Sequence, residues 1–217
     1  MGQYWAWAAA YGPAYLKAAG LTLAIATVSA LGAVALGALL LFFRTSTGRW
    51  GAWIVDAYVQ LFRNTPVLLP IYLLYFGFPL IGLVWPAVVC GGLALAMQNG
   101  AYVSEIFRGG FRAIDRVQYD AAKSIGLSRW KTFRKVTLPQ VLVYSLPALG
   151  NQVVLLLKDT SLLSAIAVAE LAMQAKLLTE RTGAAYEPFL VTAVFYLALV
   201  SIVTLVFQGA QRAVSWR

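Results

Sequence analysis

Four long stretches of the chain contain no charged residue, and their lengths limit what the chain can fold into. They are residues 21–43 (23 residues), 64–104 (41), 136–157 (22) and 188–211 (24). An α-helix rises 1.5 Å per residue, so about 20 apolar residues cross the hydrocarbon core of a bilayer. The longest stretch therefore holds two spans, separated by a turn at the Gly and Pro residues between positions 77 and 86.

This pattern predicts an all-α integral membrane protein with one domain, residues 1–217, and five transmembrane helices. We expect these helices at about residues 20–43, 59–78, 85–107, 143–164 and 187–211. Composition agrees, because 12% of the residues are charged and 61% are hydrophobic, whereas a soluble domain carries about 25% charged residues. A soluble helical domain is excluded, since it could not cover its surface with polar groups.

Composition also narrows the chemistry that the chain can perform. It has no His, its acidic residues are scattered singly, and its one cysteine, Cys90, lies in an apolar stretch. Most metal sites and every His-based catalytic arrangement are thereby excluded. We expect no bound metal, and we expect Cys90 to serve in packing.

The distribution of Lys and Arg predicts the orientation in the membrane. Eight basic residues and two acidic ones lie within residues 108–140, a segment called the basic loop below. Cytoplasmic loops are enriched in Lys and Arg, so we expect this loop and the C-terminus in the cytoplasm and the N-terminus outside. The net charge of +9 then reflects the orientation of the chain in the membrane, and no nucleic-acid partner is expected. Residues 1–19 carry only Lys17 as a charge, so no cleavable signal is expected.

The basic loop has the residue types that begin and end short helices. Asp120 and Ser128 can each accept hydrogen bonds at the start of a helix, and Gly126 between them predicts a break. Leu138–Pro139 is expected to end the element, because proline has no N–H for a continuing helix. Ala121, Ala122 and Gly126 would offer a surface of small residues to an approaching partner helix, and Trp130 and Phe133 would anchor one face.

The basic loop resembles the cytoplasmic loop of permease subunits of bacterial ABC importers. That family's Glu-Ala-Ala, followed by Gly and later by Leu-Pro, is matched here within residues 119–139, with Asp120 in place of the usual Glu. Three further segments are similar to the polar amino-acid branch of these permeases, in the same order: residues 62–66 (FRNTP), 100–110 (GAYVSEIFRGG) and 157–162 (LKDTSL). The resemblance runs from about residue 20 to residue 212.

This resemblance implies the type I ABC importer permease fold, a location in the bacterial inner membrane and a role in ATP-driven import. The family's loop forms a coupling helix that seats in a groove of a separate ATPase subunit. The residues that match it are Asp120, Ala121, Ala122 and Gly126, with Leu127 and Ser128 adjoining. The implied partners are a dimer of the ATPase, a second permease subunit, identical or homologous, an extracellular or periplasmic solute-binding protein, and membrane lipid.

No nucleotide site is visible in the sequence. Residues 126–132 (GLSRWKT) come near a phosphate-binding loop, but Trp130 stands where the second glycine is required, and no strand precedes the segment. We therefore expect the chain to bind no cofactor itself and not to be an enzyme, with ATP and Mg²⁺ held by the partner ATPase. Five helices are also too few to enclose a gated path alone, which favours a dimer of permeases.

Ionisable groups inside a membrane are costly and indicate functional sites. Lys158 and Asp159 are the strongest candidates: the pair either stabilises its own helix or contacts the solute, with Asp159 binding an ammonium group. Entry of the helix near Pro147 would put the pair near the bilayer middle, and entry near Val136 would put it near the outer boundary. Six polar residues are weaker candidates for the solute path, because each is also suited to an interhelical hydrogen bond. They are Asn64, Thr65, Gln98, Asn99, Asn151 and Gln152.

Glu105 and Arg108 lie three residues apart at a helix end, and their spacing predicts a local ion pair. Three functional interpretations stay open from the residues alone. The first is a permease subunit of an amino-acid importer, the second a secondary transporter or channel, and the third a membrane enzyme or scaffold. A secondary transporter would need a polar relay through several helices, and an enzyme would need a nucleophile and a base; neither is evident in the sequence.

Overall fold

The computed structural model describes residues 2–184 and 186–215, with side chains from residue 10 to residue 214. These residues are almost entirely helical and contain no strand. The main helices are α1 (Gly2–Ser46), α2 (Gly48–Arg63), α3 (Leu68–Tyr72), α4 (Ala87–Arg112), α5 (Arg116–Ser124), α6 (Arg129–Thr132), α7 (Leu138–Asp159), α8 (Leu171–Thr182) and α9 (Glu187–Ser215). The all-α fold predicted from the apolar stretches is confirmed.

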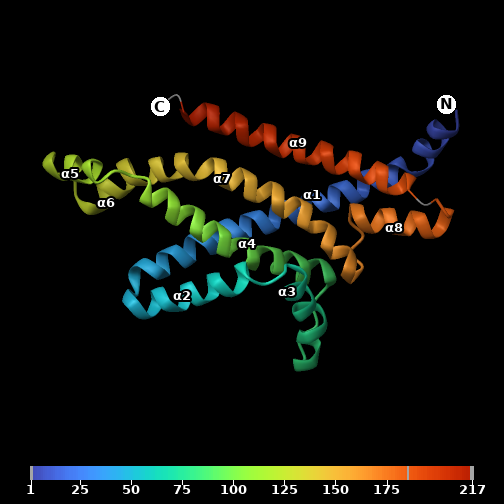
Figure 1. Ribbon diagram of the computed structural model, residues 1–217, viewed down its shortest axis with the longest axis horizontal. Helices are drawn as coiled ribbons and strands as arrows, with labels where there is room; N and C mark the ends of the chain where they lie inside the picture. The colour runs from blue at the N-terminus through green and yellow to red at the C-terminus, as the bar shows by residue number, and fades with distance from the viewer. Residues whose placement is uncertain (1, 185, 216–217) are drawn as a thin grey trace.

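The long helices run side by side along one axis of the molecule. Figure 1 shows α1, α4, α7 and α9 along this axis, with α5 and α6 at one end and α8 at the other. Helix α1 packs most extensively on α4, and α7 packs between α4 and α9. The buried core follows these contacts and includes Tyr15, Leu95 and Leu157, which have no exposed surface. The bundle therefore separates the basic loop from α8 by the full length of its helices.

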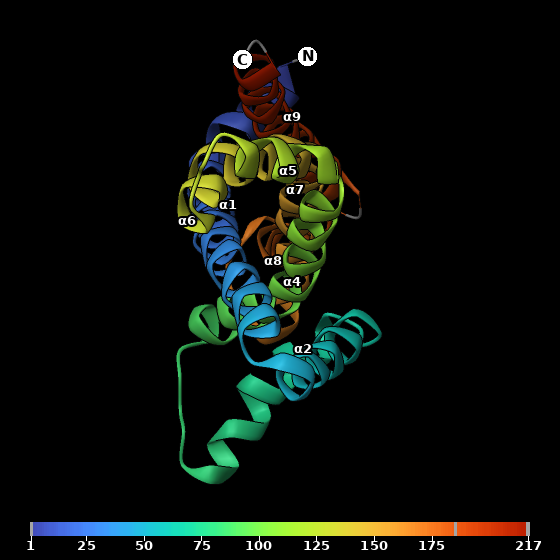
Figure 2. The ribbon, with the colours of Figure 1, turned by 90° about the vertical axis from the view of Figure 1, so that its left-hand side faces the viewer.

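The helix expected at about residues 59–78 differs in the structure. Helix α2 ends at Arg63, and the next helical segment, Leu68–Ile81, is bent by 95° from it. This segment, called the arm below, consists of α3, a π-helical turn (Leu73–Gly77) and a 3-10 turn (Phe78–Ile81), and it projects from the bundle (Figures 1 and 2). The residue before a proline is disfavoured in helical conformation, and Pro66 supplies this constraint at the break.

Three helical segments of the described chain are long and apolar enough to span a membrane. They are Ala10–Ser46, Arg129–Ile166 and Glu187–Val214, and α2 with the arm would make a fourth span if the bent pair counts as one. Helix α4 has 26 residues, but its middle carries the amides Gln98 and Asn99. The expected number of five spans is therefore not confirmed.

The helix does not end at Leu138–Pro139, so this prediction is wrong. Residues Arg129–Ile166 form one continuous helical segment in which a π-helical turn, Phe133–Thr137, stands directly before α7. A π-helical turn widens the helix locally, and interruptions of this kind can accommodate a proline. The side-chain amide of Gln140 also donates to the carbonyl of Val136 at 3.0 Å, which satisfies a backbone acceptor near the proline.

Close contact between α4 and α7 depends on one glycine. A Cβ atom at Gly110 would lie 2.4 Å from Oγ of Ser145 and 3.1 Å from the carbonyl oxygen of Val141. The neighbouring Gly109 has nothing within 4 Å of the same position. Small residues at such crossings let helix backbones approach closely in a membrane.

We expect Gly110→Ala to lower the stability of the protein by about 1–3 kcal/mol, the usual cost of overpacking a tight contact. The check is the melting temperature of the detergent-solubilised protein, followed by tryptophan fluorescence. Gly109→Ala is the matched control, and it should melt at or above the wild-type temperature. Equal melting of the two variants would show that the α4–α7 contact is not close at Gly110.

Candidate functional site

The basic loop begins with a capped helix, but the cap is not the expected one. Asp115 is the N-cap of α5, and its Oδ1 accepts a hydrogen bond from the backbone N–H of Val117 at 3.0 Å. Asp120 instead lies inside α5, with its side chain exposed. The prediction that Asp120 starts the helix is therefore wrong, because Asp115 offers the same cap one turn earlier and the longer helix forms more backbone hydrogen bonds.

The break at Gly126 is confirmed. Gly126 has φ +74°, a left-handed conformation that glycine adopts without a Cβ penalty. The N–H groups of Gly126 and Leu127 donate to the carbonyls of Lys123 and Ala122, both at 3.0 Å, which is the Schellman pattern of a helix end. Ser128 then caps α6 as predicted, with its Oγ accepting from the N–H of Lys131 at 3.4 Å.

The residues of the basic loop differ in what they can offer to a partner. Ala121, Gly126 and Ser128 are exposed, Leu127 is half-buried, and Ala122 is buried. Ala122 therefore packs within the loop and does not extend its outer surface. The loop is also fixed to the bundle by aromatic rings: Trp130 stacks on Phe133 at 5.7 Å between centroids, and Phe133 stacks on Phe111 at 6.4 Å. Figure 1 shows the loop at one tip of the molecule.

Four of the candidates for the solute path form a polar layer that links three parts of the bundle. The layer consists of Thr65, Gln98, Asn99 and Gln152. Gln98 donates from Nε2 to the carbonyl of Thr65 at 2.8 Å, and Gln152 donates from Nε2 to Oδ1 of Asn99 at 2.7 Å. Gln98 and Asn99 are buried, and Oε1 of Gln98 has no hydrogen-bond partner. The layer thus joins the α2–α3 break, α4 and α7.

The remaining candidates are exposed beside this layer or lie further along α7. Asn64 and Asn151 are exposed, and Asn64 donates to the carbonyl of Gln60 at the end of α2. Lys158 is exposed and Asp159 is half-buried at the end of α7. At 1.5 Å per residue, Lys158 lies about 30 Å along α7 from Leu138, and Asp159 lies about 10 Å beyond Gln152. Because α7 begins at Leu138, the pair occupies the end of the bundle away from the basic loop.

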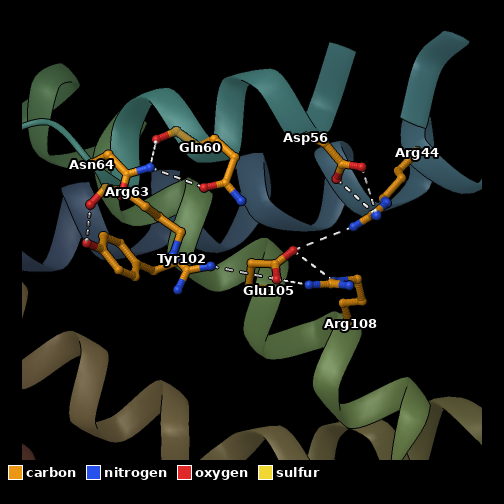
Figure 3. Close-up of polar contacts among 8 residues, drawn as sticks. All are labelled: Arg44, Asp56, Gln60, Arg63, Asn64, Tyr102, Glu105 and Arg108. Carbon is orange, nitrogen blue, oxygen red and sulfur yellow. Dashed lines mark hydrogen bonds and ion pairs between the residues drawn. The ribbon is translucent and has the colours of Figure 1, made fainter. Parts of the chain in front are cut away.

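The predicted ion pair between Glu105 and Arg108 is confirmed, and it belongs to a larger group that Figure 3 shows, called the Glu105 cluster below. Nε of Arg108 donates to Oε1 of Glu105 at 2.8 Å. Arg44 and Arg63 approach the same carboxylate at 3.6 and 3.8 Å, and Arg44 also binds Asp56 at 3.0 Å. Three guanidinium groups from α1, α2 and α4 thus meet one carboxylate, whose side chain is 18% exposed.

The sequence did not indicate the contacts of Arg44, Asp56 and Arg63 with this cluster. They come from α1 and α2, far along the chain from Glu105, and no local spacing connects them. Arg63 also lies over the ring of Tyr102 at 5.6 Å from its centroid, and the hydroxyl of Tyr102 donates to the carbonyl of Arg63 at 3.3 Å (Figure 3). The cluster therefore connects α4, just before the basic loop, with α1 and with the end of α2.

One small cavity lies beside the polar layer, and a larger groove lies between α1 and α4. The cavity beside Asn99 and Gln152 has a volume of about 10 Å³, which admits about one water. A larger groove of about 360 Å³ between α1 and α4 is apolar, and Ser29 is its one polar side chain. Among the described residues, no three His, Cys, Asp or Glu side chains come together as a metal site would require.

Comparison with known proteins identifies the family. Residues 29–216 match the family described as "binding-protein-dependent transport system inner membrane component". The chain therefore belongs to this family of membrane permeases. It is 34% identical to the arginine transport system permease protein ArtQ of Bacillus subtilis and 32% identical to the glutamine transport system permease protein GlnP of Escherichia coli, each over 92% of both chains.

Solved structures agree with this assignment. The fold superposes on a chain from the crystal structure of an amino acid ABC transporter with histidines, with a TM-score of 0.88 and 29% identity over 94% of this chain and 96% of the other. It also superposes on a chain of the MetNI methionine ABC transporter with a TM-score of 0.74 and 19% identity, over 92% and 95% of the two chains, which shows the shared fold. The chain is an amino-acid ABC transporter permease subunit and not an enzyme, so the first of the three interpretations holds.

We expect Glu105→Gln to destabilise the protein by roughly 1–3 kcal/mol, because three guanidinium groups lose their shared charged acceptor. Thermal unfolding of the solubilised protein measures the effect. The control is Glu180→Gln at an exposed position of α8, which should leave the melting temperature within a degree of wild type. If the two variants unfold alike, the Glu105 cluster does not hold α1, α2 and α4 together.

Proposed function

We propose that this chain forms the translocation path for a polar amino acid, or a close derivative, and that the basic loop couples this path to a separate ATPase subunit. The ATPase works as a dimer and holds ATP and Mg²⁺. A second permease subunit, identical or homologous, faces this chain, and an extracellular or periplasmic binding protein delivers the solute. The complex lies in a bacterial inner membrane, with the N-terminus outside and the basic loop and C-terminus in the cytoplasm.

The observation that carries the coupling role is the construction of the basic loop. It places a short capped helix, α5, and a Schellman turn at the tip of the bundle, and the segment that follows, with Trp130 and Phe133, is tied to α4 by the stacked ring of Phe111. A structured loop of this kind can transmit a movement of the partner subunit to the helices, whereas a flexible tether cannot. Its outer surface includes Val117, Ile125 and Trp130, which are 65%, 76% and 66% exposed. Large exposed apolar side chains on a charged loop outside the membrane favour a protein partner.

The solute role rests on the ionisable pair at the other end of α7. Lys158 and Asp159 carry opposite charges on adjacent residues, which suits the carboxylate and the ammonium group that every amino acid has. Asp159 is half-buried, so its charge is only partly hydrated and gains from an ammonium ligand. The polar layer lies about 10 Å back along α7, toward the basic loop, and offers amide groups. The names of the arginine and glutamine permeases among the relatives support a polar solute.

We expect Ala121→Glu to uncouple the complex. Ala121 is exposed on α5, so the variant should fold and melt like wild type, while a bulky charge obstructs docking. The measurement is ATP hydrolysis stimulated by the loaded binding protein, in a complex reconstituted with a candidate ATPase and binding protein. Stimulation should fall at least about ten-fold, equivalent to about 1.4 kcal/mol.

The matched control is Ala113→Glu, which introduces the same charge at an exposed position between α4 and α5. Stimulation should persist in this control. Full stimulation in Ala121→Glu would exclude α5 from the coupling surface. Ala122 is unsuitable for this test, because its burial means that a charged replacement would disrupt the loop itself.

We expect Asp159→Asn to reduce amino-acid uptake by at least about ten-fold, because the neutral amide no longer compensates a solute ammonium group. The probe is an equimolar mixture of the twenty ¹⁴C-labelled amino acids, taken up by proteoliposomes that contain the whole complex. Glu180→Gln, which removes an exposed charge on α8, should transport normally. Wild-type uptake by Asp159→Asn would remove Asp159 from the solute site.

A further inference from the structure

The outer part of the arm and the loop that follows it lie on the surface of the described chain. Every residue from Pro79 to Pro86 is exposed. The apolar side chains of Leu80, Ile81 and Val84, called the arm tip below, are among them, and Leu80 is 86% exposed. The arm tip also projects away from the bundle (Figures 1 and 2). The chain thus presents an apolar surface that its own helices leave open.

The arm leaves the bundle near the middle of the membrane. The candidate span of α1 is Ala10–Ser46, so Val28 is its middle residue. Ile25, about 5 Å from that middle along the helix, belongs to the same buried cluster as Ile71 at the base of the arm. From there the arm runs across the bundle, because it is bent by 95° from α2 (Figure 2). The arm tip therefore stays at the depth of the hydrocarbon core.

Lipid alone is a poor cover for this segment. Residues 83–86 adopt neither a helix nor a turn, and within the described chain no backbone hydrogen bond pairs the N–H groups of Val84 and Trp85. Irregular backbone in the hydrocarbon region is tolerated only where protein buries it or where it lines a water-filled cavity. The arm tip is apolar and residues 64–104 carry no charge, which argues against a water-filled cavity. The cover that this backbone requires is therefore another protein surface.

A surface of matching chemistry lies at the same depth. The apolar groove of about 360 Å³ is lined by residues of α1 between positions 24 and 32, with Val28 midway, and by residues of α4 between positions 88 and 96. Its one polar side chain, Ser29, already donates to the carbonyl of Gly92 at 3.1 Å. A two-fold axis along the membrane normal keeps every residue at its own depth. The arm tip of one copy can therefore reach the groove of a second copy while the reverse contact forms.

We propose that two copies of this chain pair through this contact, with the arm tip of each copy seated in the groove of the other. The inference rests on the proposed function, in which a second permease subunit faces this chain, and it identifies that subunit as an identical copy. One chain carries both the projecting apolar tip and the apolar hollow, which is what a self-complementary two-fold interface requires. Pairing in this way covers the irregular backbone of both arms at once.

Cysteine cross-linking tests which surfaces meet. Cys90 is the only cysteine of the chain, so Cys90→Ala gives a cysteine-free background for two copies with different tags, co-expressed with a candidate ATPase. Leu80→Cys in one copy and Val28→Cys in the other should form a disulfide between the copies when the membranes are oxidised. The matched control uses Leu197→Cys in place of Val28→Cys. Leu197 is as exposed as Val28 (68% and 69%) and lies near the middle of the candidate span Glu187–Val214.

The control pair should form no disulfide between the copies. Absence of the disulfide between positions 80 and 28, or an equal yield with the control pair, would overturn the proposal.

Filling the groove tests the same contact without a cross-link. A Cβ atom at Gly92 would have one neighbour within 4 Å, Oγ of Ser29 at 3.5 Å, which is an ordinary contact. Gly92→Leu should therefore melt like wild type, while its side chain occupies the groove and weakens dimerisation at least about ten-fold. Gly209→Leu, at an exposed glycine of α9 with open space around it, is the matched control and should dimerise normally.

Light scattering of the solubilised protein over a dilution series measures the dimer. Equal dimerisation of the two leucine variants would contradict the proposal. If Gly92→Leu melts below wild type, the disulfide between positions 80 and 28 decides the question.

The outcomes also separate this proposal from the proposed function. A dimer that forms without the disulfide between positions 80 and 28 leaves the second permease subunit in place and overturns the arm contact. If the disulfide forms but Ala121→Glu and Asp159→Asn behave like wild type in their own tests, the pairing stands, and the coupling and solute roles fail.

Discussion

The structure depends on the absence of water in the bilayer core, where each unpaired backbone N–H or C=O costs several kcal/mol. Long helices satisfy this constraint wherever the chain is apolar, and each interruption needs substitutes from side chains. At the end of α2, the Asn64 amide and the Thr65 hydroxyl donate to the carbonyls of Gln60 and Leu61, and Gln98 donates to the carbonyl of Thr65. The polar residues at this break thus stabilise the fold, and a solute path there would have to share them.

The same constraint separates the two candidate sites. Charged groups are absent from the middle of the long helices, so they gather at the two ends of the bundle. The Glu105 cluster and the basic loop occupy one end, and Lys158, Asp159 and Glu170 occupy the other. Helix α7 connects the ends as part of one continuous helical segment from Arg129 to Ile166. In the proposed mechanism, this segment would carry a movement of the basic loop toward Asp159.

The sequence predicted those features that depend on local chemistry. The apolar stretches predicted the helices, and the spacing of Glu105 and Arg108 predicted their ion pair. In the basic loop, Gly126 predicted the helix break and Ser128 predicted a cap. Prediction from the sequence failed where two local signals compete or where the interacting residues are distant along the chain. Asp115 and Asp120 are residues of the same capping type, and the helix begins at Asp115, where it forms more backbone hydrogen bonds. Pro139 lies in the first turn of α7, directly after a π-helical turn, where a proline is tolerated. The links from Glu105 to Arg44 and from Glu170 to Tyr196 cross between elements and have no sequence signature.

We propose that ATP acts on the side of the basic loop to drive amino acids through this chain. It is tested most directly in proteoliposomes that contain the permease, a candidate ATPase and a binding protein. ATP is supplied on one side only, and the orientation is measured by proteolysis of the basic loop. We expect uptake of labelled amino acids when ATP is on the side of the basic loop, and no uptake when ATP is on the opposite side. Uptake by the permease without the ATPase, driven by an ion gradient alone, would contradict it.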